Sequence, residues 1–179
     1  MDVRLSLVTG WRGSGKTTFC AGMVQAARQA GWDVAGLLSP AGFEEGRKTC
    51  IRAEDLRTGE RRLLASISRQ SDEDLAFGDW FFNLQTLQWG NRVLQASTPC
   101  DLLVVDELGP LEFRLSQGWV SALEVLQRGG FRRALVVIRP ELLEEARSLW
   151  RPDLIISLDK ADRVEEKVEA YARRLLMDG

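Results

Sequence analysis

The sequence predicts an α/β fold in which a mainly parallel sheet lies between helices on both faces, a three-layer α/β/α arrangement. Three observations support this fold class. Short apolar runs are typical of buried strands, they alternate with segments of helical apolar spacing, and a glycine-rich loop joins the first strand to the first helix. With 179 residues and no visible linker or repeat, residues 1–179 are expected to form a single domain.

The first segments of the chain follow this alternation. Arg4 to Thr9 is predicted to be a buried strand, and Thr17 to Ala30 a helix that ends at Gly31. Asp33 to Leu38 is predicted to be the second strand. The stretch SPAGFEEGRK that follows is predicted to be a turn-rich link that breaks the alternation.

The next part of the chain departs from the alternation. An inserted β-hairpin is predicted over about residues 48–67, with strands Thr49 to Leu56 and Arg62 to Ile67 on either side of a Thr58-Gly59 turn. Apolar positions between residues 84 and 94 then fit one face of a helix. The four residues before that face, Asp79 to Phe82, are expected to be either a loop or the first turn of the helix.

The alternation resumes in the second half of the chain. Ser116 is predicted to be the N-cap of a helix that ends at Gly129-Gly130. The other elements expected here are the strands Asp101 to Val105, Ala134 to Ile138 and Leu154 to Leu158, and the helices Glu141 to Trp150 and Arg163 to Met177.

Composition excludes several classes of function. The formal charge is 24 − 26 = −2, which gives no strong signal for nucleic-acid binding. The absence of histidine excludes Ser-His, Cys-His and His-ligated zinc chemistry. No apolar run approaches the ~18 residues that span a bilayer, so no membrane association is expected. Three isolated cysteines favour a reducing compartment, and a cytoplasmic location is predicted.

The loop after the first strand has the spacing of a phosphate-binding P-loop, G-x-x-x-x-G-K-[ST]. Its glycines let successive backbone N–H groups point inward, where they and the positive end of the next helix attract an anion. Lys16 is predicted to bind the β- and γ-phosphates and to take part in catalysis, and Thr17 to offer its hydroxyl to Mg²⁺. The predicted nucleotide-binding residues are Gly10, Trp11, Arg12, Gly13, Ser14, Gly15, Lys16, Thr17 and Thr18.

Two of these residues occupy variable positions of the motif. We expect Trp11 to brace the loop by packing, with a cover over the phosphates as the alternative. Arg12 is expected to be solvated, with a contact to the γ-phosphate as the alternative.

A second motif, LLVVDELGPLE, ends an apolar strand in two acids. Strand ends face the ligand crevice of an open α/β sheet, so Asp106 is predicted to hold Mg²⁺. Glu107 is predicted to orient or deprotonate the attacking water. Glu112 is expected either to approach the same crevice or to cap the next segment.

Other cations are candidates for stabilising charge on the transferred phosphate. Arg139 follows the strand that ends at Ile138, so it is predicted to point into the crevice and to serve as a catalytic arginine supplied by the same chain. Arg47-Lys48 is expected to be surface charge, with a γ-phosphate clamp as the alternative.

The strings TGWRGSGKTT, GERRLLA and VVDELGPLE resemble the P-loop nucleoside-triphosphatase family first described in thermophiles, whose human member is called cancer-related nucleoside triphosphatase. The resemblance covers almost the whole chain. It implies a RecA-like fold and slow Mg²⁺-dependent hydrolysis of several nucleoside triphosphates, ATP or GTP among them, to diphosphate and phosphate. The family often shows a T-x-x-N-R pattern near the base, of which this chain keeps Arg163.

Two other functions compete with hydrolysis. A P-loop nucleotide or small-molecule kinase would need an acceptor pocket, which the aromatic segment Asp79 to Gly90 would supply. A nucleotide-gated adaptor or assembly factor would bind a protein partner in the triphosphate state. The stretch Asp159 to Asp162 also loosely resembles a guanine-recognition motif, although an N-cap at Asp162 explains it more simply.

Overall fold

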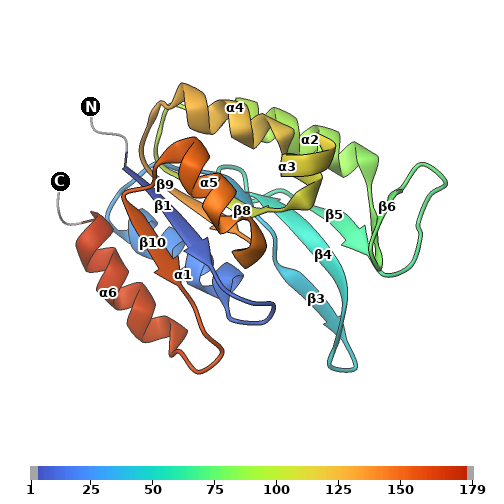
Figure 1. Cartoon of the computed structure of the whole chain (residues 1–179), viewed down its shortest axis with the longest axis horizontal. Helices are drawn as coiled ribbons and strands as arrows, with labels where there is room; N and C mark the ends of the chain where they lie inside the picture. Colours follow the sequence, from blue (N-terminus) through green and yellow to red (C-terminus); the bar gives the residue numbers. More distant parts are fainter. Residues whose placement is uncertain (1–3, 177–179) are drawn as a thin grey trace.

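The computed structural model describes residues 4–176, which form one ten-stranded sheet with helices on both faces (Figure 1). Half of this sheet is parallel. Its strands, in order across the sheet, are β10 (Leu154–Ser157), β1 (Arg4–Thr9), β9 (Phe131–Ile138), β8 (Cys100–Leu108) and β2 (Val34–Leu38). Val8 in β1 pairs with Val137 on one side and with Ile156 on the other.

The other half is antiparallel and continues the sheet beyond β2. Its strands are β4 (Arg47–Asp55), β5 (Arg61–Ser66), β7 (Trp80–Phe82) and β6 (Leu75–Phe77), with β3 (Ala41–Glu44) paired to β4. The predicted hairpin corresponds to β4 and β5, but the insertion is larger than predicted. We call strands β3 to β7 the antiparallel extension.

Two predictions in this region are wrong. The turn-rich stretch SPAGFEEGRK forms β3 and the beginning of β4, because its turn residues Glu45 and Gly46 close a tight hairpin with positive φ angles. Asp79 to Phe82 is neither a loop nor a first helical turn. Trp80–Phe82 is the strand β7, which pairs with both β5 and β6. Its conformation comes from pairing with these neighbouring strands, which the local sequence does not reveal.

The helices divide between the two faces of the sheet (Figure 1). One face carries α1 (Lys16–Gln29) and α6 (Val164–Leu176), which pack on each other. The other face carries α2 (Leu84–Gln95), α3 (Pro110–Leu115), α4 (Val120–Arg128), the short helix η1 (Pro140–Leu142) and α5 (Leu143–Trp150). Successive strand residues alternate between the two cores: Leu103 and Val105 face α2 and α4, whereas Leu102 and Val104 face α1. The three-layer α/β/α fold class is thus confirmed.

The structure differs from the helix predictions at Ser116. Ser116 does not begin a helix: it ends α3 in the left-handed region at φ 51°, and α4 begins after Trp119. The reason is that Gly109-Pro110 starts the extra helix α3, since proline at N1 is compatible with a helix start. The predicted last helix agrees with α6, and its expected end, Met177, lies outside the described residues.

Parallel strands place their carboxyl ends at one edge of the sheet, so the segments that follow β1, β8 and β9 meet there. These are the segments in which the sequence places its candidate site residues. Within residues 4–176, every helix is too short or too polar to cross a bilayer.

Candidate active site

The loop after β1 has the geometry that its glycines predict. Gly10 has a φ of 150°, and a Cβ at this position would lie 2.3 Å from the backbone oxygen of Leu158. Gly15, with a φ of 89°, precedes α1 in the left-handed region. Because glycine has no side chain to cap α1, the first N–H groups of this helix are available to an anion. The loop can therefore cradle a phosphate.

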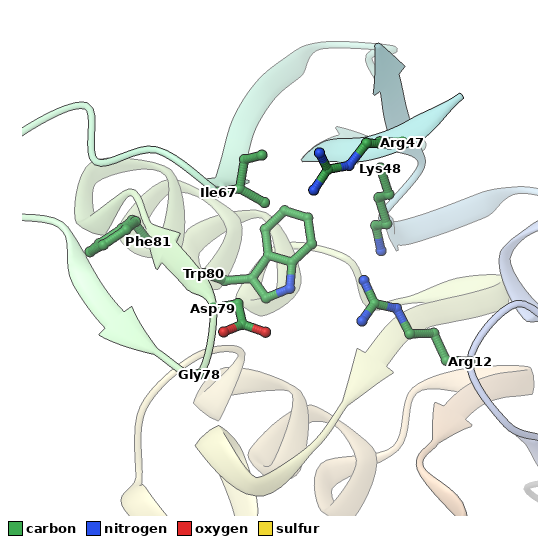
Figure 2. A pocket seen from close by; sticks show the side chains of 8 residues that line it. All are labelled: Arg12, Arg47, Lys48, Ile67, Gly78, Asp79, Trp80 and Phe81. Carbon is green, nitrogen blue, oxygen red and sulfur yellow. The ribbon is translucent and has the colours of Figure 1, made fainter. Parts of the chain in front are cut away.

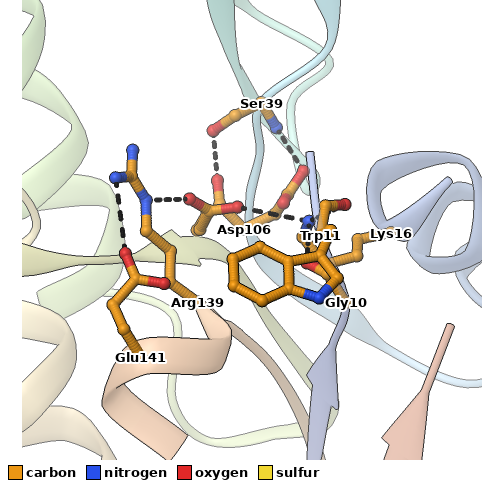
Figure 3. A network of polar contacts seen from close by, with 8 residues as sticks. Gly10, Trp11, Lys16, Ser39, Asp106, Arg139 and Glu141 are labelled. Carbon is orange, nitrogen blue, oxygen red and sulfur yellow. Dashed lines mark hydrogen bonds and ion pairs between the residues drawn. The ribbon is translucent and has the colours of Figure 1, made fainter. Parts of the chain in front are cut away.

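Lys16, the first residue of α1, reaches back over this loop (Figure 3). Its Nζ donates hydrogen bonds to the carbonyl oxygens of Gly10 at 2.7 Å and Trp11 at 3.2 Å. The side chain is only 10% exposed. The ammonium group thus lies at the mouth of the phosphate cradle, as its predicted role requires.

Two buried hydroxyl groups near the loop have no hydrogen-bond partner among residues 4–176. They belong to Thr9, the last residue of β1, and to Ser14 in the loop, and both side chains are buried. An orphaned buried hydroxyl is unusual in a folded protein and calls for a partner such as a ligand or water. The loop thus offers unused hydrogen-bonding groups where a phosphate would lie.

Asp106, at the end of β8, is brought beside the first turn of α1. Its carboxylate accepts hydrogen bonds from the hydroxyl of Thr17 and from the backbone N–H of Ser39, the latter at 3.1 Å. The Ser39 hydroxyl also donates to the Asp106 carbonyl oxygen (Figure 3). Burial raises the pKa of Asp106 to about 6, against the effect of these two hydrogen bonds to its carboxylate.

The predicted magnesium site fits this arrangement. Thr17 and Asp106 offer a hydroxyl and a carboxylate, the hard oxygen ligands that Mg²⁺ prefers. No group of three or more His, Cys, Asp or Glu side chains in the described part of the chain is placed to hold a metal. A bound Mg²⁺ would therefore take its other ligands from phosphate oxygens and water, as is usual for this ion.

Glu107 lies between two cations. Its Oε2 is 3.9 Å from Nζ of Lys16, and its Oε1 accepts a 2.9 Å hydrogen bond from Nε of Arg139. Arg139 follows β9 and also contacts Glu141, with 3.8 Å between Nη1 and Oε1 (Figure 3). The structure thus brings Lys16, Glu107 and Arg139 together, in the crevice where the sequence placed them.

Glu112 serves as a capping residue, the second of its two predicted roles. Its carboxylate accepts hydrogen bonds from the backbone N–H groups of Gly109 and Trp119, both at 2.8 Å. It therefore joins the start of α3 to the start of α4. Burial raises its pKa to about 7, and the charge of Glu107 adds to this effect, whereas the two N–H donors oppose it.

The remaining predicted nucleotide-binding residues are more exposed. Trp11 does not brace the loop: its side chain is 72% exposed, because the loop turns outward at this position and no neighbouring element covers it. Arg12 is exposed as predicted, and so are Gly13 and Thr18. Arg163 lies just before α6 and pairs with Glu166 at 2.9 Å on the surface.

The segment that precedes α6 and the first residue of this helix lie beside the P-loop. A Cβ at Gly13 would be 3.7 Å from Cε of Lys160, and one at Gly15 would be 2.7 Å from Cγ2 of Val164. Asp162 accepts a 2.6 Å hydrogen bond from the N–H of Asp159 and pairs with Lys167. These two contacts of Asp162 stabilise the conformation of the segment before α6.

Lys48 lies closer to the site than the sequence predicts. The sequence predicts surface charge at this position, but the Lys48 side chain is half-buried near the P-loop. Burial lowers its pKa, and the charge of Arg12 adds to this effect, whereas those of Glu107 and Asp106 oppose it. The signal in the sequence was weak, because only the fold of the antiparallel extension carries Lys48 toward the crevice.

The fold and this site together define a protein of the P-loop NTPase class, in which a strand, a phosphate-binding loop and a helix face an acidic strand end. A sequence model of the NTPase family matches residues 6–168. The chain therefore belongs to the NTPase family, a family of nucleoside-triphosphate hydrolases, as the resemblance noted in its motifs implies.

Individual relatives agree with this assignment. The nucleoside-triphosphatase THEP1 of Methanosarcina acetivorans is 28% identical over 172 residues, which cover 94% of this chain and 95% of that protein. THEP1 of Methanosarcina barkeri is 35% identical over 121 residues, covering 66% and 67%.

Two solved structures share the fold. A human cancer-related nucleoside triphosphatase superimposes with a TM-score of 0.73 at 22% identity, covering 98% of this chain and 99% of that one. THEP1 from Aquifex aeolicus superimposes with a TM-score of 0.68 at 20% identity, covering 96% and 98%.

Proposed function

We propose that this protein is a Mg²⁺-dependent nucleoside triphosphatase that hydrolyses NTP to NDP and phosphate with broad base specificity. In this reaction a water oxygen bonds to the γ-phosphorus, and the bond from that phosphorus to the β–γ bridging oxygen breaks. The observation that best supports the proposal is the meeting of Lys16, Asp106 and Glu107 at the carboxyl ends of β1 and β8.

Binding of the triphosphate is assigned to the P-loop. Backbone N–H groups of residues 13–17 would surround the phosphates, and the hydroxyl of Ser14, which lacks a partner among residues 4–176, would gain one. The ammonium group of Lys16 would exchange its bonds to Gly10 and Trp11 for bonds to the β- and γ-phosphates. These contacts would position the γ-phosphate near Glu107, whose carboxylate lies 3.9 Å from Nζ of Lys16.

Mg²⁺ would be held by the hydroxyl of Thr17 and, directly or through water, by Asp106. When bound, it supplies charge neutralisation to the β- and γ-phosphate oxygens. The hydrogen bond from the Thr17 hydroxyl to the Asp106 carboxylate joins α1 to β8 and keeps both side chains in place. The backbone N–H of Ser39 fixes one oxygen of the carboxylate.

Glu107 is assigned the role of orienting and activating the attacking water. Its carboxylate accepts a hydrogen bond from Arg139 and keeps lone pairs free to accept one from a water molecule. Arg139 would hold the carboxylate in this orientation. Arg139 and the half-buried Lys48 are the cations placed to offset charge that develops on the γ-phosphate oxygens.

Broad base specificity follows from the exposed character of the segment beside the P-loop. Lys160 and Arg163 are long, solvent-exposed side chains, and Arg163 pairs with Glu166. Such groups can contact any base without selecting one by buried hydrogen bonds. We also place the activity in the cytoplasm, in keeping with the three free thiols of Cys20, Cys50 and Cys100.

The experiment that tests this proposal is phosphate release from ATP, GTP, CTP and UTP, each with Mg²⁺ or with EDTA and no other substrate. We expect release from several nucleotides with Mg²⁺ and none with EDTA. Adjacent threonines give a matched pair: Thr17→Ala should raise the Mg²⁺ concentration needed for half-maximal rate far more than the exposed Thr18→Ala. Tight nucleotide binding without release would contradict hydrolysis and favour a kinase lacking its acceptor or a switch lacking its protein partner.

A further inference from the structure

A large pocket lies between the P-loop and the antiparallel extension, outside the residues assigned to hydrolysis except at its rim (Figure 2). Its volume is about 680 Å³. We call it the cationic pocket, because three of its lining side chains are Arg12, Arg47 and Lys48. Asp79, from the β6–β7 turn, and Trp80, from β7, also line the pocket.

The three cations of this pocket are not neutralised by a direct salt bridge in the described part of the chain. No carboxylate among residues 4–176 forms an ion pair with Arg12, Arg47 or Lys48. Burial, and after it the charge of Arg12, lowers the pKa of Lys48, whereas the charges of Glu107 and Asp106 raise it. An anion bound among the three cations would form charge-assisted hydrogen bonds with them.

Trp80 and Asp79 give the rest of the pocket an aromatic surface and a hydrogen-bond acceptor, which suit a ligand with a flat ring and polar groups at its edge. The indole of Trp80 lies in the middle of the pocket in Figure 2, and Nζ of Lys48 is 5.3 Å from its ring centroid. Aromatic side chains of this kind stack with bases. Asp79 is exposed on the side of Trp80 away from Arg47 and Lys48, where it can accept hydrogen bonds from hydroxyl or amino groups.

We propose that the cationic pocket is a second ligand site, which binds a nucleoside monophosphate beside the triphosphate held in the P-loop. The phosphate would lie among Arg12, Arg47 and Lys48, the base against Trp80, and the sugar or base edge near Asp79. Pockets of roughly 300–1,000 Å³ hold small molecules of this size, whereas inorganic phosphate alone would fill only a small part of this one.

The pocket is separate from the place expected for the base of the triphosphate. Lys160, in the segment before α6, and Val164, the first residue of α6, contact the P-loop from the side of β10. The pocket lies toward β4, which the strands β9, β8 and β2 separate from β1. The two sites would share only the phosphate end, where Arg12 belongs to the P-loop and Lys48 is close enough to Asp106 and Glu107 to feel their charge.

The test is calorimetric titration of the full chain with AMP, GMP, CMP and UMP. The P-loop is first saturated with a non-hydrolysable ATP analogue and Mg²⁺, and this first titration reports separately on the triphosphate site. The inference rests on the proposed function only for the position of the triphosphate. Failure of the analogue to bind would count against the proposed function, whereas the monophosphate titration requires no hydrolysis.

We expect at least one monophosphate to bind the saturated protein with a stoichiometry of one. Arg47→Ala and Trp80→Leu should each weaken this binding about tenfold or more, a loss of ~1.4 kcal/mol. Arg47→Lys and Trp80→Phe should restore most of it, because they keep the charge and the ring. Arg52→Ala is the matched control, since Arg52 is an exposed arginine of the same strand β4 outside the pocket.

Three results would overturn the inference. One is the absence of monophosphate binding once the analogue is bound, which would mean that the two ligands compete for the P-loop. Another is binding that Arg47→Ala and Trp80→Leu leave unchanged. The third is equal affinity for inorganic phosphate and for monophosphates, which would show that the base does not contribute to binding.

Discussion

The loop after β1 and the end of β8 both carry candidate active-site residues, but they are held in place in different ways. The P-loop is held by its own backbone: Lys16 bonds to the carbonyl groups of Gly10 and Trp11, and the N–H of Ser14 donates to the Trp11 carbonyl at 3.1 Å. It is a local structure, and a short motif suffices to specify it.

The end of β8 is held by residues distant in the sequence. Ser39 fixes Asp106, and Arg139 fixes Glu107. Just after β8, Glu112 joins the start of α3 to the start of α4 through the N–H groups of Gly109 and Trp119. This difference teaches that the conformation of the P-loop depends mainly on hydrogen bonds within the loop, whereas the positions of the acids at the end of β8 depend on tertiary contacts.

The largest expected effect concerns the P-loop itself. Lys16→Ala should weaken nucleoside triphosphate binding ~100-fold, because a charged hydrogen-bonding group contributes up to about 3 kcal/mol. Equilibrium titration with a fluorescent nucleotide measures this change. Thermal unfolding without nucleotide should be little affected, and unchanged affinity would remove Lys16 from the site.

Glu112 in α3 gives the next largest effect, on the stability of the protein. Its pKa is raised from 4.5 to about 7 by burial, so the folded state binds this proton more tightly than the unfolded chain does. The resulting stabilisation is complete below pH 4.5 and is lost as the pH rises through 7. Between pH 5 and 8 the loss amounts to about 2.5 kcal/mol.

Glu112→Gln should remove this share of the pH dependence, at the cost of one hydrogen-bond acceptor. Urea unfolding of both proteins from pH 5 to 8 measures it. Asp106, whose pKa is raised to about 6 by burial, contributes a slope of the same sign in both proteins. Equal slopes for wild type and Glu112→Gln would show that Glu112 is already ionised when folded at pH 5.

Arg139→Ala should have a smaller effect, on the positioning of Glu107. We expect kcat to fall about fivefold to tenfold, because an exposed ion pair contributes about 1 kcal/mol. KM should change little, and Arg139→Lys should recover part of the rate. Arg147→Ala, which breaks an exposed ion pair with Glu144, is the control. A rise in KM at constant kcat would instead place Arg139 in substrate binding.

The smallest effect is expected at Trp11, the exposed residue of the P-loop. Trp11→Ala should change the free energy of unfolding by less than ~0.5 kcal/mol, as is usual for surface positions. Trp119→Ala, at a side chain that is 3% exposed, should cost about 3–5 kcal/mol. Comparable losses in urea unfolding would mean that Trp11 packs after all.

The parallel half of the fold could be predicted from the sequence because its strands are buried on both faces. Runs such as Leu102 to Val105 and Ala134 to Ile138 are continuously apolar, and helices with clear periodicity separate them. The antiparallel extension could be predicted only in part. Trp80–Phe82 and Ala41–Glu44 are short, half-exposed strands whose structure comes from pairing with neighbours.

The candidate site divides in the same way. The P-loop motif and the acids at the end of β8 have fixed spacing within the chain, so the sequence alone predicts Lys16, Thr17, Asp106 and Glu107 as site residues, and the structure places them near one another. Lys48 was undervalued, and the contact of Ser39 with Asp106 was missed. Both depend on how the extension and β2 lie against β8, which no local pattern encodes.

The central claim is that Glu107 activates water on a triphosphate that the P-loop holds. The most direct measurement is phosphate release under single-turnover conditions with Mg²⁺ by wild type and by Glu107→Gln, with the nucleotide affinity of both measured in parallel. The claim predicts a rate lower by ~100-fold or more at nearly unchanged affinity. An unchanged rate in Glu107→Gln would contradict it.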